Sequence, residues 1–218
     1  MGRRALSKID PTLNVTPFLR KLDQLPTPFD PAEFFGRAAP LELEMGSGKG
    51  WFLTQSALRH PDRNFVGVEY AKKYAYFCAS RLAKFGLTNA LMIDGDGLRL
   101  FHEFYPARIA DRVHVYFPDP WWKKRHRKRR VLNESFLQDA FRVLKPAGRL
   151  VFWTDVQEYF DTSLELIAAT TQFSLPIPVE EPGPEEFRTH FERRKRMIGE
   201  TIYRAEFEKP KSLGDEAT

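Results

Sequence analysis

Three closely spaced glycines at the end of a short apolar run are the first residues with a chemical meaning. Gly46, Gly48 and Gly50 follow the run from Leu41 to Met45. Glycine adopts backbone angles with φ above zero and brings no side chain, so a ligand can lie directly against the main chain. The spacing predicts a strand that ends in a ligand-binding loop, with a glycine-rich turn that binds nothing as the alternative.

The residues around these glycines exclude two common nucleotide loops. A dinucleotide loop reads Gly-x-Gly-x-x-Gly, but Trp51 stands at the third glycine position. A phosphate loop needs Ser or Thr after Gly-Lys, and here a glycine follows Lys49. The remaining Glu-x-Gly-x-Gly-x-Gly pattern, from Glu44 to Gly50, resembles the first motif of the Rossmann-like methyltransferases that bind S-adenosylmethionine. That cofactor carries an ammonium and a sulfonium, which favour a nearby carboxylate.

The composition indicates one domain without metal or membrane chemistry. The chain has 218 residues, 42% of them hydrophobic, and a formal net charge of +5 that favours an anionic partner. The single cysteine, Cys78, excludes an internal disulfide and a Cys-based zinc cluster, and His126 has no second His at metal-ligand spacing, so we expect no metal. The first residues lack the apolar core of a signal peptide, and no apolar run approaches membrane-spanning length. We therefore expect a cytoplasmic protein that does not associate with membranes.

Short apolar runs alternate with helix-period segments from Leu41 onward, a pattern typical of a parallel sheet with helices on both faces. We predict an α/β fold of the Rossmann-like class I methyltransferase type, with a mostly parallel seven-stranded sheet and an antiparallel last strand. Strands are expected at 41–45, 64–69, 90–94, 112–117, 149–154 and 202–207, and helices at 51–60, 71–85, 133–144, 157–170 and 185–196. We divide the chain into a basic, Pro-rich N-terminal arm (1–39), the methyltransferase domain (40–209) and a flexible C-terminal tail (210–218). Glu42 is an exception, because a carboxylate is unexpected in a strand covered on both faces.

Acidic residues stand at the carboxyl ends of the predicted strands, the edge where open α/β sheets bind ligands. Glu44 ends the first strand, Glu69 ends the second, Asp96 follows the third and Asp119 follows the fourth. An acid at the second position commonly grips a ribose diol, so Glu69 indicates a nucleoside cofactor. Each acid alone suits a helix cap or a solvated turn equally well, but together they favour a ligand site.

An aromatic and basic run follows the fourth predicted strand. Two prolines flank Asp119, Trp121 and Trp122 come next, and every position from 123 to 130 except His126 is Lys or Arg. Cations that bind phosphates beside rings that stack on bases suit RNA, whereas a solvated basic surface is the alternative. The residues expected to contact the RNA backbone are Lys124, Arg125, Arg127, Lys128, Arg129 and Arg130.

This run, with Thr154-Asp155-Val156 and the stretch from Thr189 to Glu192, resembles the motif set of the bacterial tRNA (guanine-N7)-methyltransferase family. The resemblance implies tRNA as partner, S-adenosylmethionine as cofactor, methyl transfer to N7 of a guanine in the variable loop, and no obligatory protein partner. It implies cofactor contacts from Glu44, Gly46, Gly48, Gly50, Glu69, Asp96 and Asp119, with Asp119 also the catalytic acid. It implies substrate contacts from Lys123, Asp155, Thr189, His190, Phe191 and Glu192.

The sequence departs from the family pattern at three positions. Trp122 stands where Pro is common, Gly97 where Ala is usual, and Lys195 where Gly is common. The first and the last bear on tRNA contact and leave the cofactor residues untouched.

The residues also fit the implied chemistry. Purine N7 has an in-plane lone pair and no proton at neutral pH, so its attack on a sulfonium methyl needs alignment rather than a strong base. A carboxylate such as Asp119 can stabilise the charge that moves to the base. Two alternatives remain: a small-molecule methyltransferase, which the basic run disfavours, and a non-catalytic RNA-binding protein, which the retained cofactor motif disfavours.

Overall fold

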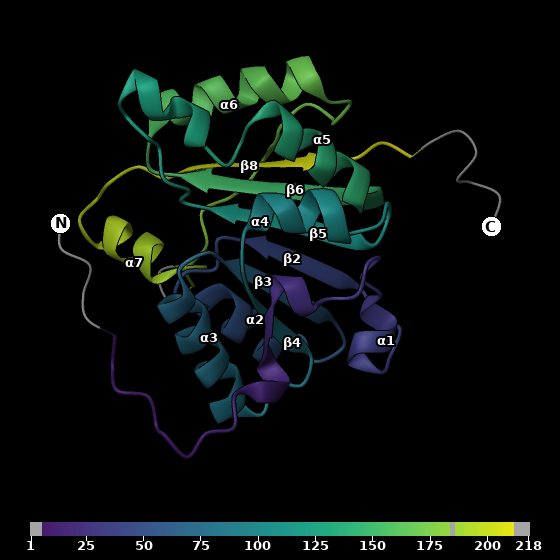
Figure 1. Ribbon diagram of the computed structural model, residues 1–218. Coiled ribbons are helices and arrows are strands. Elements are labelled where there is room, and N and C mark those ends of the chain that lie inside the picture. The colour runs from purple at the N-terminus through teal and green to yellow at the C-terminus, as the bar shows by residue number, and fades with distance from the viewer. Residues whose placement is uncertain (1–5, 184–185, 212–218) are drawn as a thin grey trace.

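The computed structural model describes residues 6–183 and 186–211 (Figure 1). The predicted C-terminal tail lies outside the described residues from position 212 on. The strands are β1 (Leu19–Lys21), β2 (Leu41–Met45), β3 (Asn64–Glu69), β4 (Ala90–Asp94), β5 (Ala110–Tyr116), β6 (Leu144–Thr154), β7 (Ile177–Pro178) and β8 (Tyr203–Glu208). The helices are α1 (Pro31–Phe35), α2 (Trp51–Arg59), α3 (Lys72–Phe85), α4 (Gly97–Arg99), α5 (Glu134–Val143), α6 (Gln157–Thr170) and α7 (His190–Met197). Three 3-10 turns and one π-helical turn complete them: η1 (Thr16–Phe18), η2 (Leu22–Gln24), η4 (Lys124–Arg129) and the π-helical η3 (Leu100–Phe104).

The strands form one sheet in the order β1-β4-β3-β2-β5-β6-β8-β7. All pairs from β1 to β6 in this order are parallel, whereas β8 runs antiparallel to both β6 and β7. The α/β fold, the mostly parallel sheet and the antiparallel last strand are thus confirmed. The described residues form eight strands rather than the predicted seven, and β1 and β7, with only three and two residues and thus too short to show a period, lie outside the predicted strand ranges.

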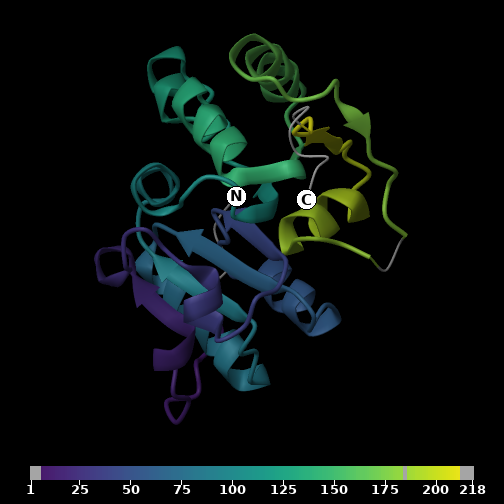
Figure 2. The same cartoon turned by 90° about the vertical axis from the view of Figure 1, so that its right-hand side faces the viewer.

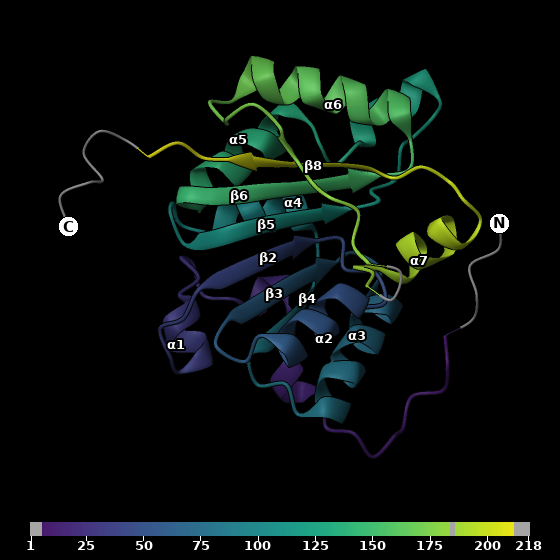
Figure 3. The same cartoon turned by 180° about the vertical axis from the view of Figure 1, so that it is seen from behind.

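Two layers of helices enclose the sheet. On one face, the odd residues of β2 (Leu41, Leu43 and Met45) pack with buried side chains of α5 and α6. On the opposite face, α2 and α3 form a second apolar cluster around Leu53 and Cys78. Figure 1 shows α4 and α5 in front of the sheet, and Figure 3 shows α2 and α3 on its other side. This double cover is the arrangement that the alternating pattern predicted.

The N-terminal segment contributes to the sheet. Phe18, Leu22, Leu25 and Phe29 are buried, and β1 pairs in parallel with β4. In Figure 2 this purple segment and the yellow β8 lie at opposite ends of the sheet. From Thr16 on, residues assigned to the arm therefore form part of the core.

Glu42 is buried in β2 and fully partnered. Its carboxylate accepts a hydrogen bond from Arg63 Nη1 (2.8 Å) and lies 2.8 Å from His114 Nε2, while His114 Nδ1 lies 2.9 Å from the Tyr116 hydroxyl. Burial alone would raise the pKa of Glu42, but the hydrogen bond from His114 and the nearby arginines lower it to about 2. Burial lowers the pKa of His114, so the imidazole is neutral, donates from Nε2 to Glu42 and accepts from Tyr116. A complete set of partners explains this carboxylate within a covered strand.

Candidate active site

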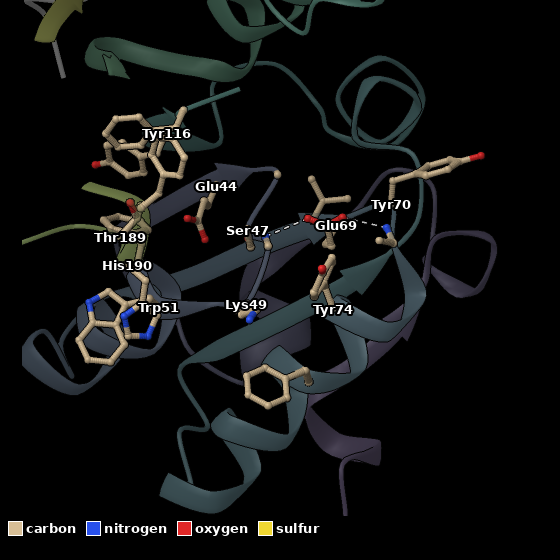
Figure 4. Close-up of a pocket in the computed structure, with 18 of the residues that line it drawn as sticks. Glu44, Ser47, Lys49, Trp51, Glu69, Tyr70, Tyr74, Tyr116, Thr189 and His190 are labelled. Atoms are coloured by element: carbon tan, nitrogen blue, oxygen red, sulfur yellow. Dashed lines mark hydrogen bonds between the residues drawn. The ribbon is translucent and has the colours of Figure 1, made fainter. Parts of the chain in front are cut away.

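A cavity of about 1570 Å³ opens at the carboxyl ends of the central strands. Residues of the glycine loop, of α3 and α7, and of the loops after β3, β4 and β5 line it. Figure 4 shows Glu44, Ser47 and Glu69 around this space, with Trp51 and His190 to one side. The sequence-predicted residues that line it are Glu44, Gly46, Gly48, Glu69, Asp96, Asp119, Arg129, Thr189, His190 and Phe191.

The three glycines serve two different purposes. All have positive φ: 77° at Gly46, 55° at Gly48 and 67° at Gly50. A Cβ at Gly46 or Gly48 would meet no atom within 4 Å, so backbone conformation and open space for a ligand explain these two. A Cβ at Gly50 would lie 2.0 Å from Cys78 Sγ, and Gly50 does not line the cavity. Gly50 therefore lets α3 pack against the loop.

Glu44 is a buried carboxyl without a full set of partners. Its Oε2 and the Oγ of Ser47 are both buried and have no hydrogen-bond partner among the described residues. Burial raises the pKa of Glu44 to about 8; the nearby Ser47 hydroxyl opposes this rise, although it is not in hydrogen-bonding geometry, and the charge of Glu69 adds to it. A buried polar pair of this kind is costly unless a ligand satisfies it. The arrangement fits a cationic ligand group.

Glu69 and Asp96 stand at the next two strand ends. Glu69 accepts hydrogen bonds from the backbone N–H groups of Gly48 (2.9 Å) and Ala71 (2.8 Å), one to each carboxylate oxygen. Asp96 caps α4 through Oδ1, which accepts from Leu98 N at 2.9 Å. These hydrogen bonds hold both side chains in place. Each carboxylate oxygen has two lone pairs, so it can still accept a hydrogen bond from a hydroxyl group.

The loop that carries Asp119 is strained and anchored. The residues on either side of Pro118-Asp119-Pro120 have positive φ, 49° at Phe117 and 46° at Trp121, which is costly for large side chains. Phe117 donates its N–H to the carbonyl of β6 residue Trp153 (2.8 Å), and its ring contacts Phe191 of α7 at 4.9 Å. These contacts hold the exposed carboxylate of Asp119 at the cavity mouth.

The basic run divides into exposed and partnered residues. Arg125, Lys128 and Arg129 are exposed, and the Arg129 guanidinium lies 5.1 Å above the Trp121 ring. Lys123 is also exposed but does not line the cavity, and Arg127 pairs with Glu158 at 3.1 Å. The exposed residues without an acidic partner among the described residues, Lys123, Arg125, Lys128 and Arg129, are available to an anionic partner, whereas the side chain of Lys124 lies outside what the structure describes.

Arg130 departs from the expected phosphate contact. It is only 7% exposed. Its guanidinium donates to the Pro120 carbonyl (2.8 Å), pairs with Glu158 (3.1 Å) and lies over the Tyr159 ring (4.5 Å). These interactions use its donors inside the protein, so Arg130 fixes the Asp119 loop.

The motif from Thr189 to Glu192 forms the start of α7. The Thr189 hydroxyl accepts from Glu192 N (3.0 Å), and the Glu192 carboxylate accepts from the N–H of Arg188, the residue before the N-cap, so both side chains stabilise the first turn. Glu192 is fully buried, does not line the cavity and lies 3.8 Å from Arg204 of β8. It therefore orients the helix, while His190 and Phe191 face the cavity.

Asp155 also lies outside the cavity lining, because α7 engages it. Its carboxylate pairs with Lys195 Nζ at 2.8 Å, and Lys195 bonds to Glu200 as well. The lysine that departs from the family pattern thus contacts an expected substrate residue and ties α7 to the end of β6.

Several cavity residues escaped the sequence analysis. The Trp51 ring stacks on Phe187 with centroids 5.2 Å apart and lies 4.2 Å from the His190 ring. Arg81 also lies over the Trp51 ring, 5.0 Å from its centroid. In the sequence, Trp51 indicates only that the third glycine of a dinucleotide loop is absent. Nothing local in the sequence connects Trp51 with α7.

Neither a metal site nor a membrane helix is present in the described parts of the chain. Within residues 6–183 and 186–211, no group of three or more His, Cys, Asp or Glu side chains could hold a metal ion. None of the helices described there is long and apolar enough to cross a bilayer.

Known structures share the fold at low sequence identity. A variant of the 16S rRNA (adenine(1408)-N(1))-methyltransferase from Catenulisporales acidiphilia, solved with its cosubstrate S-adenosylmethionine, superposes with a TM-score of 0.61 and 21% identity, covering 86% of this chain and 94% of that one. A tRNA (m1A58) methyltransferase from Aquifex aeolicus gives a TM-score of 0.55 and 19% identity over 79% of this chain and 63% of the other. These likenesses establish a methyltransferase fold.

Sequence comparison is more specific. Residues 38–205 match a family model described as a putative methyltransferase. A tRNA (guanine-N(7)-)-methyltransferase from Rhodopirellula baltica is 44% identical over 218 residues, which cover 96% of this chain and 80% of the relative. One from Myxococcus xanthus is 37% identical over 187 residues, 84% of this chain and 90% of the relative. The protein therefore belongs to the tRNA (guanine-N7)-methyltransferase family.

Proposed function

We propose that the protein transfers the methyl group of S-adenosylmethionine to N7 of a guanine in the variable loop of tRNA. One observation carries the proposal: a single cavity is lined both by the glycine loop with Glu44 and Glu69 and by Asp119, His190 and Phe191 from the tRNA-family motifs. Membership of the family agrees with this joint site.

The residues present fit the cofactor. Glu44 Oε2 and Ser47 Oγ are buried and have no hydrogen-bond partner among the described residues. Such oxygens can accept hydrogen bonds from the ammonium group of the cofactor, in place of the water that this group loses on binding. Glu69 and Asp96 would accept from ribose or amine hydrogens, and Gly46 and Gly48 leave the backbone uncovered. The bound cofactor supplies an electrophilic methyl group on a sulfonium.

The remaining residues of the cavity would handle the guanine. N7 needs no deprotonation, so the chain has to orient the base and exclude water. Trp121, Phe191 and His190 provide flat faces at the mouth, and Asp119 provides a negative charge close to where the base becomes cationic. The A-form major groove is too deep and narrow for side chains, which favours a guanine outside regular helix.

The tRNA substrate also bears on the cellular location of the enzyme and on the partners that it needs. We place the enzyme in the cytoplasm, acting without an obligatory protein partner, and we assign catalysis to the region 40–209 together with the N-terminal residues that complete the sheet.

The test is a product analysis. Purified protein, unmodified tRNA transcript and S-adenosylmethionine should give one methylated guanine, which reduction followed by aniline treatment converts into a single chain break. Asp119→Ala should abolish the break while its circular dichroism spectrum stays close to that of the parent. Methyl transfer without a break would assign another acceptor atom, and transfer to a small molecule alone would make the protein a different enzyme.

A further inference from the structure

A second group of cations lines the cavity away from the basic run. We name the second basic face as Arg81 and Lys84 of α3 with Arg193 and Arg194 of α7. α3 follows β3, whereas the basic run follows β5, and these strands lie on opposite sides of β2. Figures 1 and 3 show α3 and α7 together near the carboxyl ends of the strands. The cavity therefore has cationic residues on both sides.

Arginines of this face rest on aromatic rings instead of pairing with acids. Arg81 lies 5.0 Å from the Trp51 ring, Arg193 lies 5.3 Å from the Phe187 ring, and Arg194 lies 5.6 Å from the Phe191 ring. None of the three forms an ion pair with a carboxylate in the described parts of the chain. A stacked guanidinium keeps its in-plane N–H donors available for a bidentate anion.

Several other arginines pair with acids. Arg127 and Arg130 share Glu158, Arg149 pairs with Glu206, and Arg142 pairs with Asp139. Arg81, Arg193 and Arg194 lack such acidic partners among the described residues, as does Arg129 of the basic run, so both groups can pair with an external anion.

His190 reports the resulting positive potential. Burial lowers the pKa of this imidazole, and the charges of Arg81, Arg194, Lys49 and Arg193 lower it further. The ring therefore stays neutral among cations and can stack on a base without adding repulsion.

The size of the cavity argues for a polymer. Small-molecule sites usually occupy roughly 300 to 1,000 Å³, and this cavity has about 1570 Å³. Cationic groups on two sides of such a space suit a chain that crosses it and places phosphates on each side of an inserted nucleotide.

We propose that the second basic face binds RNA phosphates, so that the tRNA strand carrying the target guanine spans the cavity between this face and the exposed part of the basic run. The inference rests on the proposed function and extends it to a surface outside the family motifs. RNA is the occupant because cations lie over Trp121 and Phe191, rings that line the same cavity and can stack on bases.

The test compares three charge-matched pairs of substitutions in the full chain. Arg193→Gln/Arg194→Gln alters the second basic face, and Lys128→Gln/Arg129→Gln alters the basic run; all four side chains are exposed. Arg59→Gln/Lys145→Gln is the control, at the amino-terminal edge of the sheet and away from the cavity. The dissociation constant for tRNA is measured at several salt concentrations, and the dissociation constant for the cofactor is measured separately by calorimetry.

Each of the first two pairs should weaken tRNA binding and reduce the salt slope by roughly 1.4 to 1.8, at about 0.7 to 0.9 per lost phosphate contact. The two reductions should add in the quadruple variant, and the control should keep the slope of the parent. An unchanged slope for Arg193→Gln/Arg194→Gln, or a loss of cofactor affinity in its place, would overturn the inference. A parent that binds tRNA without methylating it would count against the proposed function and leave the comparison of slopes valid.

Discussion

Glu42 and Glu44 lie two residues apart on β2 and are both buried on the α2 side of the sheet, yet their acidities move in opposite directions. Arg63 and His114 lower the pKa of Glu42 to about 2, whereas burial without a cation raises that of Glu44 to about 8. Both have less than a tenth of their surface exposed, so burial does not distinguish them. Their partners do: a buried carboxylate with a full set of partners, such as Glu42, belongs to the fold, whereas Glu44 Oε2 lies beside the cavity without a hydrogen-bond partner among the described residues, which fits a ligand site.

The same distinction separates the arginines. Arg130 has its partners inside the protein and holds the Asp119 loop, while Arg129, its neighbour, lines the cavity above Trp121. Arg193 and Arg194 rest on rings and face outward. Counting charges along the sequence cannot make this distinction, because it depends on acids contributed by distant elements.

The largest effect is expected at the satisfied carboxylate. Glu42→Ala should lower the free energy of unfolding by about 3 to 5 kcal/mol, since it leaves Arg63 and the buried His114 without their partner. Cofactor affinity, measured below the unfolding transition, should stay near that of the parent. Strong loss of cofactor binding with unchanged stability would reverse the roles of the two carboxylates.

The acid stability of the parent has the same origin. The folded pKa of Glu42 lies below its unfolded value of 4.5, so its contribution is complete above that value and is lost as the pH falls toward about 2. His114, whose folded pKa is lowered from 6.5, adds a loss that begins as the pH falls below that value. Glu42→Ala should remove the part of this pH dependence that lies below 4.5.

The second prediction concerns the pH dependence of cofactor binding. Glu44 with a pKa near 8 is protonated in the free protein at pH 6, and a cationic ligand favours its ionised form. Binding should therefore release a proton, and the dissociation constant should fall by up to about tenfold per pH unit between pH 6 and 8 before levelling off. Calorimetry in two buffers of different ionisation enthalpy measures the release.

Glu44→Gln is the matched control for that measurement. It should bind the cofactor about 1 to 3 kcal/mol more weakly at pH 8, release no proton from this position and retain only the titration of the cofactor itself. Its folded state should be more stable than the parent's at high pH, because the parent's stability falls as the pH rises from 4.5 through 8. Identical pH profiles for the two proteins would show that Glu44 does not face the cofactor's positive charge.

The third prediction compares neighbours in the basic run. Arg130→Met should lower kcat about 10- to 100-fold, because the Asp119 loop loses its anchor at Pro120 and a small displacement of a reacting group is costly. The salt slope of tRNA binding should not change. Arg129→Met should do the opposite, reducing the slope by roughly 0.7 to 0.9 with little change in kcat. A reduced slope for Arg130→Met with normal kcat would instead support the phosphate contact that the sequence suggested for Arg130.

Sequence reasoning located features that are encoded locally. The alternating apolar residues of β2 predict a strand, and the glycines at every second position from Gly46 to Gly50 predict a loop. The structure has both, within ten residues. The acids at the strand ends follow from the same pattern, because parallel strands end at one edge. Local residue types were enough for this part of the site.

Features that depend on distant contacts were not predictable. The partner of Glu42 is His114, 72 positions away, and the ring stacked on Trp51 belongs to Phe187. Periodicity within one segment carries no information on such pairs. β1 and β7 were missed for a different reason, their length. Thr189 is an N-cap of a residue type that favours helix starts, which the sequence shows locally, whereas the contact between Glu192 and Arg204 of β8 depends on the fold.

The smallest effect is expected at Lys195, a satisfied charge that this chain has where the family commonly has glycine. Its ion pairs with Asp155 and Glu200 are partly exposed, so Lys195→Gln should cost less than about 1 kcal/mol of stability. The Asp155 carboxylate, released from Lys195, would then carry an uncompensated negative charge between the end of β6 and α7. It should repel phosphate, raise KM for tRNA two- to fivefold and leave kcat unchanged, an effect of about 0.4 to 1 kcal/mol. Asp155→Asn alone should keep KM near that of the parent, and the double variant Lys195→Gln/Asp155→Asn should restore it. If Lys195→Gln instead lowered KM, the pair would be holding a substrate ligand back, and the rule that a partnered charge belongs to the fold would not extend to this position.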